Sequence, residues 1–345
     1  MTRPMPRPRV IHLFDDATAG GVMRVLDHIE TSPQMAADAE HILRAVDRHS
    51  LSLGRIDADI IVSHLAISWR SLPMLTMLRL LHPRTPLVHV EHSYTKAFVA
   101  ENVQNPRRFK CLLRLAYRLF DMVIAVSHAQ DKWLCESGAV PRAKLRVIQS
   151  CVDLSAFRAI AAPAGPGRVI GAIGRLDRQK GFDTLVTAFR QTDAPDLALH
   201  IYGEGAEEAD LRRLAGDDAR IQFMGFASDP SAALAAVDVV AMPSRWEAYG
   251  LVALEALAAH RMLLVSGLDG LADHVATRAV STNGTSVQAW CEALNRLPAP
   301  SLRALETGPD RAERPEQIFA RKWRDLIGVV SPQNATFRPH QTAEA

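Results

Sequence analysis

The sequence predicts an α/β protein of two domains, each built on a parallel β-sheet, and three features of the chain support this prediction. Its 345 residues amount to about two domains of ordinary size. Short apolar runs alternate with helical patterns, which is typical of buried parallel strands joined by helices. One segment rich in Pro, Gly and Ala, residues 161–167, separates two series of such runs. We therefore expect two facing domains with a cleft between them.

The first domain is expected over residues 1–160. Its strand-like apolar runs are Arg9–Phe14, Asp59–Val62, Leu87–Val90 and Met122–Val126. Gly20 and Gly21 follow the first of these runs and precede apolar residues at helical spacing. A strand, a glycine turn and a helix are therefore expected to succeed one another at the start of this domain.

The second domain is expected over residues 168–315. Its strand-like runs are Arg168–Ile173, Leu197–Tyr202, Ile221–Phe223, Val237–Ala241 and Met262–Val265. Beyond them we expect a C-terminal helix over residues 316–330 that packs back toward the first domain, and then a frayed tail over residues 331–345.

Composition and charge exclude several classes of protein. Hydrophobic residues make up 48% of the chain and charged residues 23%, as in an ordinary globular protein. No apolar run approaches the roughly 20 residues of a membrane-spanning helix, and no signal-peptide core follows the first residues, so we expect a cytoplasmic protein. The first 158 residues hold 21 basic and 15 acidic residues, whereas the rest of the chain holds 19 basic and 23 acidic residues. This imbalance is too mild for a nucleic-acid binder but suits a first domain that meets an anionic surface.

A loop with two cations follows the first strand of the second domain. It runs from Gly174 and Arg175 to Lys180 and Gly181. Because open α/β sheets bind ligands outside the carboxyl ends of their strands, these cations are placed to meet a diphosphate. Taken alone, they are more often solvated surface charges.

A second motif lies at residues 243–258, where a turn-rich stretch gives way to a helical pattern near Gly250. The free N–H groups of Leu251 and Val252 at such a helix start would favour a phosphate. Glu255 stands one turn inside this otherwise apolar helix, where a carboxylate needs a partner. A sugar hydroxyl or ribose diol would serve, and so would a neighbouring arginine; the sequence favours neither.

Together these motifs resemble the nucleotide-sugar glycosyltransferases of family 4, which carry the glycosyltransferase group 1 C-terminal domain and have the GT-B fold of two facing Rossmann-like domains. The resemblance is strongest over residues 168–275, where Glu247 and Glu255 look like the two glutamates of the family and residues 266–271 like its following glycine turn. In the first half, Gly20 and Gly21 are similar to its donor-facing glycine loop, and His92 to its histidine near the transferred sugar. This sequence departs from the family pattern in the short stretch at residues 31–55 and in the pair Ser150-Cys151, where Asn-Gly is common.

The resemblance implies a retaining enzyme that moves a sugar from a UDP- or GDP-sugar to a glycan or lipid-linked acceptor, as in cell-surface polysaccharide or glycolipid synthesis. The implied catalytic residues are His92, Arg175, Lys180 and Glu247. The implied donor-binding residues are Gly20, Gly21, Gly174, Arg175, Lys180, Glu247, Tyr249, Gly250, Leu251, Val252 and Glu255. Since cations and helix N–H groups can stabilise the leaving diphosphate, no metal and no cofactor are expected.

Three other functions compete with this interpretation. A nucleotide-sugar epimerase or phosphorylase would share the fold, and a non-catalytic sugar-nucleotide-binding subunit would share the binding motifs. A dehydrogenase is disfavoured because Glu208 stands where the third glycine of the dinucleotide fingerprint belongs.

Residues 107–120 form a pattern with one basic and one apolar helical face. The basic face consists of Arg107, Lys110, Arg114 and Arg118. These cations either point into solvent while the apolar face packs on the first sheet, or lie against an anionic bilayer at the inner face of the cell membrane.

Overall fold

A computed structural model of the chain describes residues 7–18, 20–163, 167–277, 279–282, 284–297 and 313–331. The expected tail beyond residue 331 and most of the segment that joins the second domain to the C-terminal helix lie outside the described residues. Within the described ranges, no helix has the length and apolar content needed to cross a bilayer.

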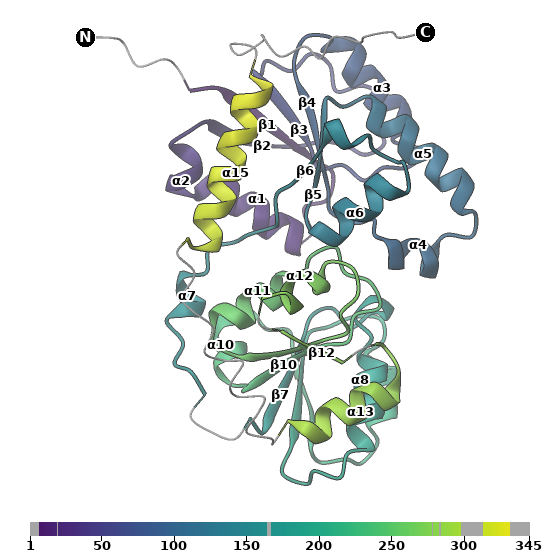
Figure 1. The fold of residues 1–345 in the computed structure, drawn as a ribbon, viewed down its shortest axis with the longest axis vertical. Helices are drawn as coiled ribbons and strands as arrows, with labels where there is room; N and C mark the ends of the chain where they lie inside the picture. Colours follow the sequence, from purple (N-terminus) through teal and green to yellow (C-terminus); the bar gives the residue numbers. More distant parts are fainter. Residues whose placement is uncertain are drawn as a thin grey trace.

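The first domain contains a six-stranded parallel sheet in the order β2-β1-β3-β4-β5-β6 (Figure 1). Its strands are β1 (Arg9–Phe14), β2 (Glu40–Ala45), β3 (Ile60–Ser63), β4 (Leu87–Glu91), β5 (Met122–Ala125) and β6 (Leu145–Val147). Its helices are α1 (Gly21–Thr31), α2 (Pro33–Ala36), α3 (Leu72–Leu81), α4 (Lys96–Asn102), α5 (Pro106–Arg118) and α6 (His128–Glu136), and the 3₁₀ turn η1 (Arg142–Lys144) precedes β6.

The expected runs correspond to β1, β3, β4 and β5, whereas β2 and β6 were not expected. Both are edge strands: β2 is largely exposed and β6 has only three residues. Neither gives the continuous apolar run by which a strand buried on both faces is recognised.

The second domain contains another six-stranded parallel sheet, in the order β12-β11-β10-β7-β8-β9. Its strands are β7 (Val169–Ile173), β8 (Ala198–Tyr202), β9 (Ile221–Gly225), β10 (Val239–Met242), β11 (Met262–Val265) and β12 (Val280–Ser281). Its helices are α8 (Phe182–Arg190), α9 (Glu208–Ala215), α10 (Pro230–Ala235), α11 (Leu251–Ala258), α12 (Leu271–Val275) and α13 (Val287–Arg296), with the 3₁₀ turn η2 (Arg178–Lys180) before α8. The five expected runs correspond to β7 to β11. This is the doubly wound order, in which the direction of winding reverses between β7 and β10.

The carboxyl edges of the two sheets face each other across the domain interface (Figure 1). Arg178, on the turn after β7, forms an ion pair with Glu101 of the first domain. Trp246, on the loop after β10, packs edge-on against Phe98, with 6.1 Å between ring centroids. The loops that follow β7 and β10 therefore lie at the interface.

Two carboxylates of the second domain cap helices of the first. Asp269 accepts hydrogen bonds from the Thr95 hydroxyl at 2.5 Å and from the Ala97 N–H at 3.2 Å, at the start of α4. Asp273 accepts from the His128 N–H at 2.9 Å, at the start of α6. Since the first N–H groups of a helix have no partner within the helix, these bonds satisfy polar groups that the interface covers.

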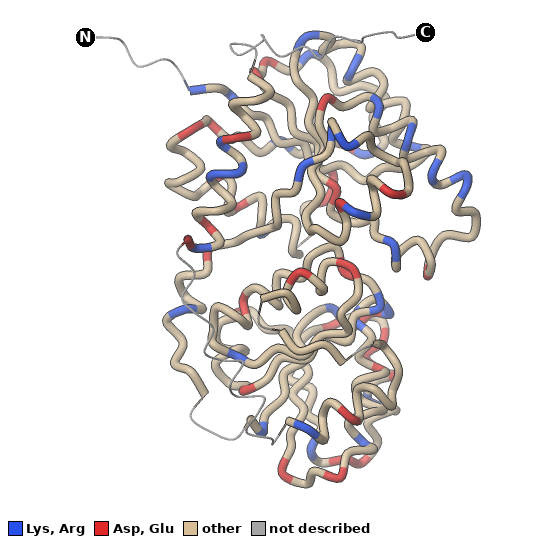
Figure 2. The backbone as a smooth tube through the Cα atoms, viewed as in Figure 1, with Lys and Arg blue, Asp and Glu red and all other residues tan. Residues whose placement is uncertain are grey.

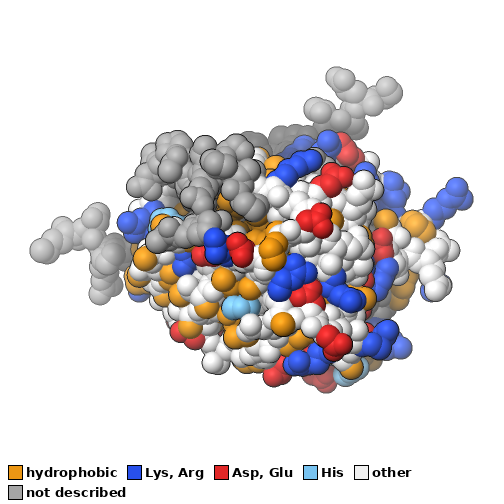
Figure 3. Space-filling view, turned by 90° about the horizontal axis from the view of Figure 1, so that it is seen from below, with side chains coloured by type: hydrophobic (Ala, Val, Ile, Leu, Met, Phe, Trp, Pro, Cys, Tyr) orange, Lys and Arg blue, Asp and Glu red, His pale blue; other side chains and the backbone are white. Residues whose placement is uncertain are grey.

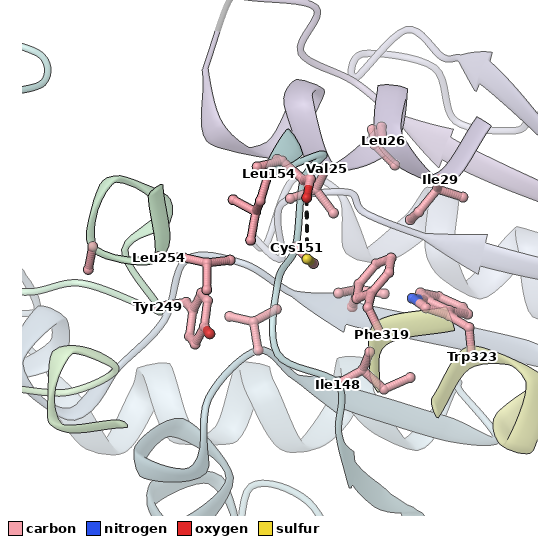
Figure 4. Close-up of a cluster of buried hydrophobic side chains, with 14 of the residues drawn as sticks. Val25, Leu26, Ile29, Ile148, Cys151, Leu154, Tyr249, Leu254, Phe319 and Trp323 are labelled. Atoms are coloured by element: carbon pink, nitrogen blue, oxygen red, sulfur yellow. Dashed lines mark hydrogen bonds between the residues drawn. The ribbon is translucent and has the colours of Figure 1, made fainter. Parts of the chain in front are cut away.

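One hydrophobic cluster is shared by both domains. Figure 4 shows Val25 and Leu154 of the first domain near Tyr249 and Leu254 of the second. The same cluster includes Trp323 of the C-terminal helix α15 (Pro315–Val330), so burial of apolar surface holds all three parts together.

Helix α15 packs on the first domain, where Arg324 donates to Asp38 at 2.8 Å. Its first turn is attached to α7 (Ser155–Arg158), which lies between the two sheets in sequence. There the buried carboxylate of Glu316 accepts hydrogen bonds from Arg158, at 2.7 and 3.2 Å, and from the Leu154 N–H at 3.1 Å. Burial raises the pKa of Glu316, but these hydrogen bonds outweigh it and leave the pKa below its ordinary value.

Replacing Glu316 with Gln is expected to lower the free energy of unfolding by about 2–3 kcal/mol, because the Arg158 guanidinium loses its charged partner. Folding lowers the pKa of Glu316. The ionised carboxylate therefore contributes to the free energy of unfolding above the ordinary glutamate pKa of about 4.3, and this contribution is lost as the pH falls through the pKa of the folded protein. Urea unfolding at several pH values measures this. Glu313→Gln, which removes an exposed partner of Arg321, is the control and should change little. Equal effects of the two variants would contradict the role of Glu316.

Candidate active site

The loop after β7 brings Lys180 toward the motif after β10. Gly174 has a φ of 153°, and a Cβ atom there would lie 3.3 Å from Cε of Lys180, so the lysine stem packs against the glycine. Nζ of Lys180 lies 2.6 Å from Oε2 of Glu247. These two predicted site residues, 67 positions apart, therefore form an ion pair where the sheet reverses its winding.

Arg175, the other predicted cation, is exposed and stays on its own loop. Its guanidinium lies 3.3 Å from the Asp177 carboxylate and 3.2 Å from Oε1 of Gln179. Among the described residues, it forms no hydrogen bond or ion pair with Glu247 or Glu255. The Arg175 guanidinium thus makes solvent-exposed contacts within its own loop, and such contacts contribute little to stability.

Helix α11 begins at Leu251, as the sequence predicted. The residue before it, Gly250, has a φ of 90°, and a Cβ atom there would lie 2.9 Å from Cδ2 of Leu271. Only glycine fits this turn without strain. Among the described residues, no side-chain hydrogen bond caps the start of this helix, so the first N–H groups, which include those of Leu251 and Val252, are available to a ligand.

The glycine pair of the first domain faces the start of α11. Gly20 precedes the first residue of α1, and a Cβ atom on Gly21 would lie 3.4 Å from Cδ1 of Leu251. The N-termini of α1 and α11, one from each domain, therefore meet at the interface. Two positive helix ends side by side create a local preference for an anion.

Tyr249 has a different place from the other predicted donor-binding residues. Its ring is buried in the shared core, 4.7 Å from the ring of His274, and its carbonyl oxygen bonds to Nε2 of the same histidine at 3.0 Å. Tyr249 thus anchors the loop that leads into α11.

Glu255 pairs with an arginine from the opposite domain. Its buried carboxylate lies 2.5 Å from Nη2 of Arg24, which stands in the first turn of α1. Burial raises the pKa of Glu255, and the Arg24 charge opposes that rise. Of the two partners left open by the sequence, the structure shows the arginine. Arg24 itself was not predicted; its position four residues after Gly20 was the only local signal.

His92 directly follows β4 at the same interface. Its Nε2 lies 2.8 Å from Nδ1 of His64, and the side chain is half-buried. Burial lowers the pKa of His92 to about 4, with His89 acting in the same direction and Glu91 against it. The imidazole is therefore neutral at neutral pH. Within the described part of the chain, no hydrogen bond or ion pair joins it to Lys180 or Glu247.

Among the described residues, no group of three or more His, Cys, Asp or Glu side chains is arranged to bind a metal ion. The carboxylates of Glu247 and Glu255 are each paired with a cation instead.

The two doubly wound domains, facing each other through their carboxyl edges, define the GT-B class of glycosyltransferase fold. HepE from Anabaena, solved in complex with UDP and glucose, has this fold: it superposes with a TM-score of 0.67 at 17% sequence identity, covering 95% of this chain and 98% of that one.

Comparisons of sequence identify the family. A model described as Glycosyltransferase Family 4 matches residues 7–156, and one described as Glycosyl transferases group 1 matches residues 167–299. A D-inositol 3-phosphate glycosyltransferase from Corynebacterium urealyticum is 27% identical over 333 residues, covering 86% of this chain and 76% of that protein. The lipopolysaccharide core biosynthesis mannosyltransferase LpcC from Rhizobium leguminosarum bv. viciae is 30% identical over 215 residues, which cover 57% of this chain and 58% of that protein. The chain belongs to glycosyltransferase family 4.

The Arg24–Glu255 pair gives a prediction about stability that is independent of substrate. Replacing Arg24 with Ala leaves a buried carboxylate without its cation and should lower the free energy of unfolding at about pH 8 by about 2 kcal/mol. The loss should shrink toward about pH 5, because the already raised pKa of Glu255 rises further and the carboxylate takes up a proton. Urea unfolding at both pH values tests this.

The matched control is Arg24→Ala in a Glu255→Gln background, where no buried charge remains. There the arginine change should cost little at either pH. A loss of the same size in both backgrounds would mean that Arg24 stabilises the fold in another way.

Proposed function

We propose that this glycosyltransferase transfers a sugar from a UDP- or GDP-sugar, with retention of anomeric configuration, to a glycan or lipid-linked acceptor in cell-surface polysaccharide or glycolipid synthesis. The observation that carries the proposal is the Lys180–Glu247 pair beside the uncapped start of α11, at the interface between the domains. The complex of HepE with UDP and glucose and the lipopolysaccharide role of LpcC support the choice of donor and pathway class.

The leaving diphosphate is the group that this site must stabilise. When the bond from the sugar to the diphosphate breaks, negative charge accumulates on the phosphate oxygens and the sugar becomes oxocarbenium-like. Lys180, Arg175 and the N–H groups of Leu251 and Val252 supply positive charge and hydrogen-bond donors there. Gly21 and Gly174 let the backbone approach closely.

The two glutamates bind the neutral parts of the donor in this proposal. Glu247 accepts from the sugar hydroxyls, and Glu255 accepts from the ribose diol. Because Glu255 is paired with Arg24, the ribose either shares the carboxylate with the guanidinium or displaces it. His92 lies on the acceptor side, near the transferred sugar.

The proposed reaction takes place on one face of the sugar. The bond between the anomeric carbon and the diphosphate oxygen breaks, the acceptor oxygen forms the new bond from the same side, and the acceptor proton passes to the departing phosphate oxygen. No protein base is needed. The cations and helix N–H groups take the role that a metal ion has in other transferases, so we propose that the enzyme works without one.

Thermal melting with a panel of UDP- and GDP-sugars tests the donor. Saturation with the correct donor at 100 times its dissociation constant adds roughly 2.7 kcal/mol, enough to raise the melting temperature measurably. Glu255→Gln should reduce this shift, because its ribose contact is weakened. No shift with any nucleotide sugar would overturn the proposal, and turnover of the donor without an acceptor would favour an epimerase or phosphorylase instead.

Transfer kinetics test the two cations. Lys180→Ala and Arg175→Ala should each lower kcat/KM, because each removes a hydrogen-bond donor to the developing diphosphate. The expected loss of transition-state stabilisation is roughly 3 kcal/mol for each variant. Arg213→Ala, which removes an exposed cation on α9, is the matched control. Wild-type rates in either site variant would contradict the assignment. A chelator should leave the rate unchanged; a loss that magnesium or manganese restores would show that a metal takes part.

The acceptor side of the proposal concerns α5. Its apolar residues Leu112, Leu113 and Ala116 are buried against the first sheet, whereas its basic residues remain at the surface. These are Arg107, Arg114 and Arg118, which are exposed, and Lys110, which is half-buried. Exposed Leu115 lies among them.

The charge distribution around α5 differs from that at the far end of the second domain. Figure 2 shows basic residues in succession along α5, whereas the face of the second domain in Figure 3 mixes acidic and basic side chains. We propose that the α5 surface meets anionic lipid and so brings the first domain to a lipid-linked acceptor.

Liposome sedimentation tests this contact. The protein should bind anionic but not neutral vesicles, and binding should be lost at high salt, because each cation near the surface contributes about 1 kcal/mol. Arg107→Ser with Arg118→Ser should weaken binding. Arg212→Ser with Arg213→Ser, two cations removed from α9 of the second domain, should not. No binding to anionic vesicles at low salt would contradict the proposed contact of α5 with lipid.

A further inference from the structure

Four histidines cross the first sheet on four neighbouring strands. His41 is on the edge strand β2, His12 on β1, His64 directly after β3, and His92 directly after β4. Only His92 belongs to the site proposed above.

The strand register places these histidines on one face of the sheet. Val10 is opposite His41, and His12 lies two positions further along the same strand. His12 is opposite Val62, and His64 again lies two positions further on. Because side chains alternate between faces with a period of two, each step keeps the histidine on the same face and moves it toward the carboxyl edge. The row therefore climbs diagonally from the outer strand to the domain interface.

Hydrogen bonds join the four rings into a chain. Nδ1 of His41 lies 2.9 Å from Nε2 of His12, Nδ1 of His12 lies 2.9 Å from Nε2 of His64, and Nδ1 of His64 lies 2.8 Å from Nε2 of His92. His12 and His64 use both ring nitrogens. Within the described residues, no hydrogen bond uses Nδ1 of His92, at the interface end.

All four imidazoles are neutral at neutral pH. Burial lowers the pKa of His12 and His64 well below the ordinary value and lowers those of His41 and His92 to about 4. The titratable groups that act on the ends of the chain are Asp38 near His41, and Glu91 and His89 near His92.

A chain of neutral imidazoles can have only one direction of donation. A neutral imidazole has one N–H and one bare nitrogen, so each interior ring donates on one side and accepts on the other. The three hydrogen bonds must therefore all run the same way. Either every ring carries its proton on Nδ1, and His92 offers an N–H at the interface, or every ring carries it on Nε2, and His92 offers a bare nitrogen.

The outer end of the chain favours the first arrangement. Nε2 of His41 and Nε1 of Trp323 are both buried, and neither has a hydrogen-bond partner among the described residues. Their rings are neighbours, with centroids 6.4 Å apart. The indole N–H can only donate, so a proton on His41 Nε2 would leave two unpaired buried donors near each other, whereas a bare Nε2 leaves one.

We propose that His41, His12 and His64 form a tautomer relay, with the bare Nε2 of His41 near the Trp323 indole, that fixes His92 as an Nδ1–H donor at the domain interface. The three outer histidines are positioning residues, because they act on the reaction only through His92. That part of the inference rests on the proposed function; the tautomers themselves do not.

Nitrogen-15 NMR of the histidine-labelled full-length protein tests the relay without any substrate. In water a free neutral imidazole carries its proton mainly on Nε2, so four rings with the proton on Nδ1 would be a departure from the default. We expect this at neutral pH for all four, with no protonation down to about pH 5. A protonated ring, or any of the four with its proton on Nε2 at neutral pH, would overturn the proposal.

His64→Ala breaks the relay next to His92. Water can enter the polar space that the ring leaves, so His92 should return toward the Nε2–H form while His12 and His41 keep theirs. Trp323→Phe keeps an aromatic ring but removes the indole N–H, so a proton on His41 Nε2 no longer adds a second unpaired donor there; this second variant should give a mixture of both forms in all four rings. The matched control is His28→Ala. His28 is a buried histidine on α1 that packs on Phe319 and forms no hydrogen bond with the four histidines among the described residues, so this variant should leave all four tautomers unchanged.

Kinetics then separate positioning from a merely structural role. His64→Ala should lower kcat by about tenfold, with the dissociation constant of the nucleotide unchanged, because one hydrogen bond to the reacting sugar is lost. If His92 changes its tautomer but kcat does not fall, the relay stands and the role of His92 in the proposed function is wrong. If His92 keeps Nδ1–H in His64→Ala, the relay is refuted.

Discussion

Parallel strands place all the loops that follow them at one edge of the sheet, and in this chain both sheets turn that edge toward the other domain. Two sets of polar contacts at the interface follow from this arrangement. Helices α4 and α6 begin at the carboxyl edge of the first sheet, so their N-termini face the second domain. Asp269 and Asp273 supply the carboxylates that those N-termini lack. The domains are thus joined by groups that would otherwise be buried without partners.

The same constraint explains why charged residues are tolerated at the interface. Glu255 is almost fully buried, yet Arg24 of the opposite domain compensates its charge, and Lys180 pairs with Glu247 nearby. A ligand that takes the Glu255 carboxylate changes the electrostatic balance of both domains together, because its partner Arg24 belongs to the first domain. Binding of a donor and the relative placement of the domains are therefore expected to be coupled, and the raised pKa of Glu255 makes that coupling sensitive to acid.

The face of the first sheet under α15 combines apolar packing with a polar row. Trp323 packs edge-on against His12, with ring centroids 5.6 Å apart, and the histidine nitrogens bond to one another rather than to solvent. A buried polar network is stable only when its members are satisfied, which restricts what can replace any one of them. The C-terminal helix thus affects the interface although it lies on the outer part of the first domain.

The sequence by itself determined the features that depend on neighbours along the chain. Apolar runs identified nine of the twelve strands, the loop from Gly174 to Gly181 was recognised as a cationic turn, and the start of α11 was placed at Gly250. The edge strands β2, β6 and β12 were missed, because short or exposed strands lack a continuous apolar run.

Only the tertiary structure decided which distant residues meet. It chose Arg24 as the partner of Glu255, attached α15 through Glu316 to Arg158, and aligned His41, His12, His64 and His92 on one face. These pairings depend on strand order, register and the direction of winding. The local sequence pattern shows whether a segment is a helix or a strand and where it ends. The register between strands depends on how the whole sheet packs, and no single segment of the sequence carries that information.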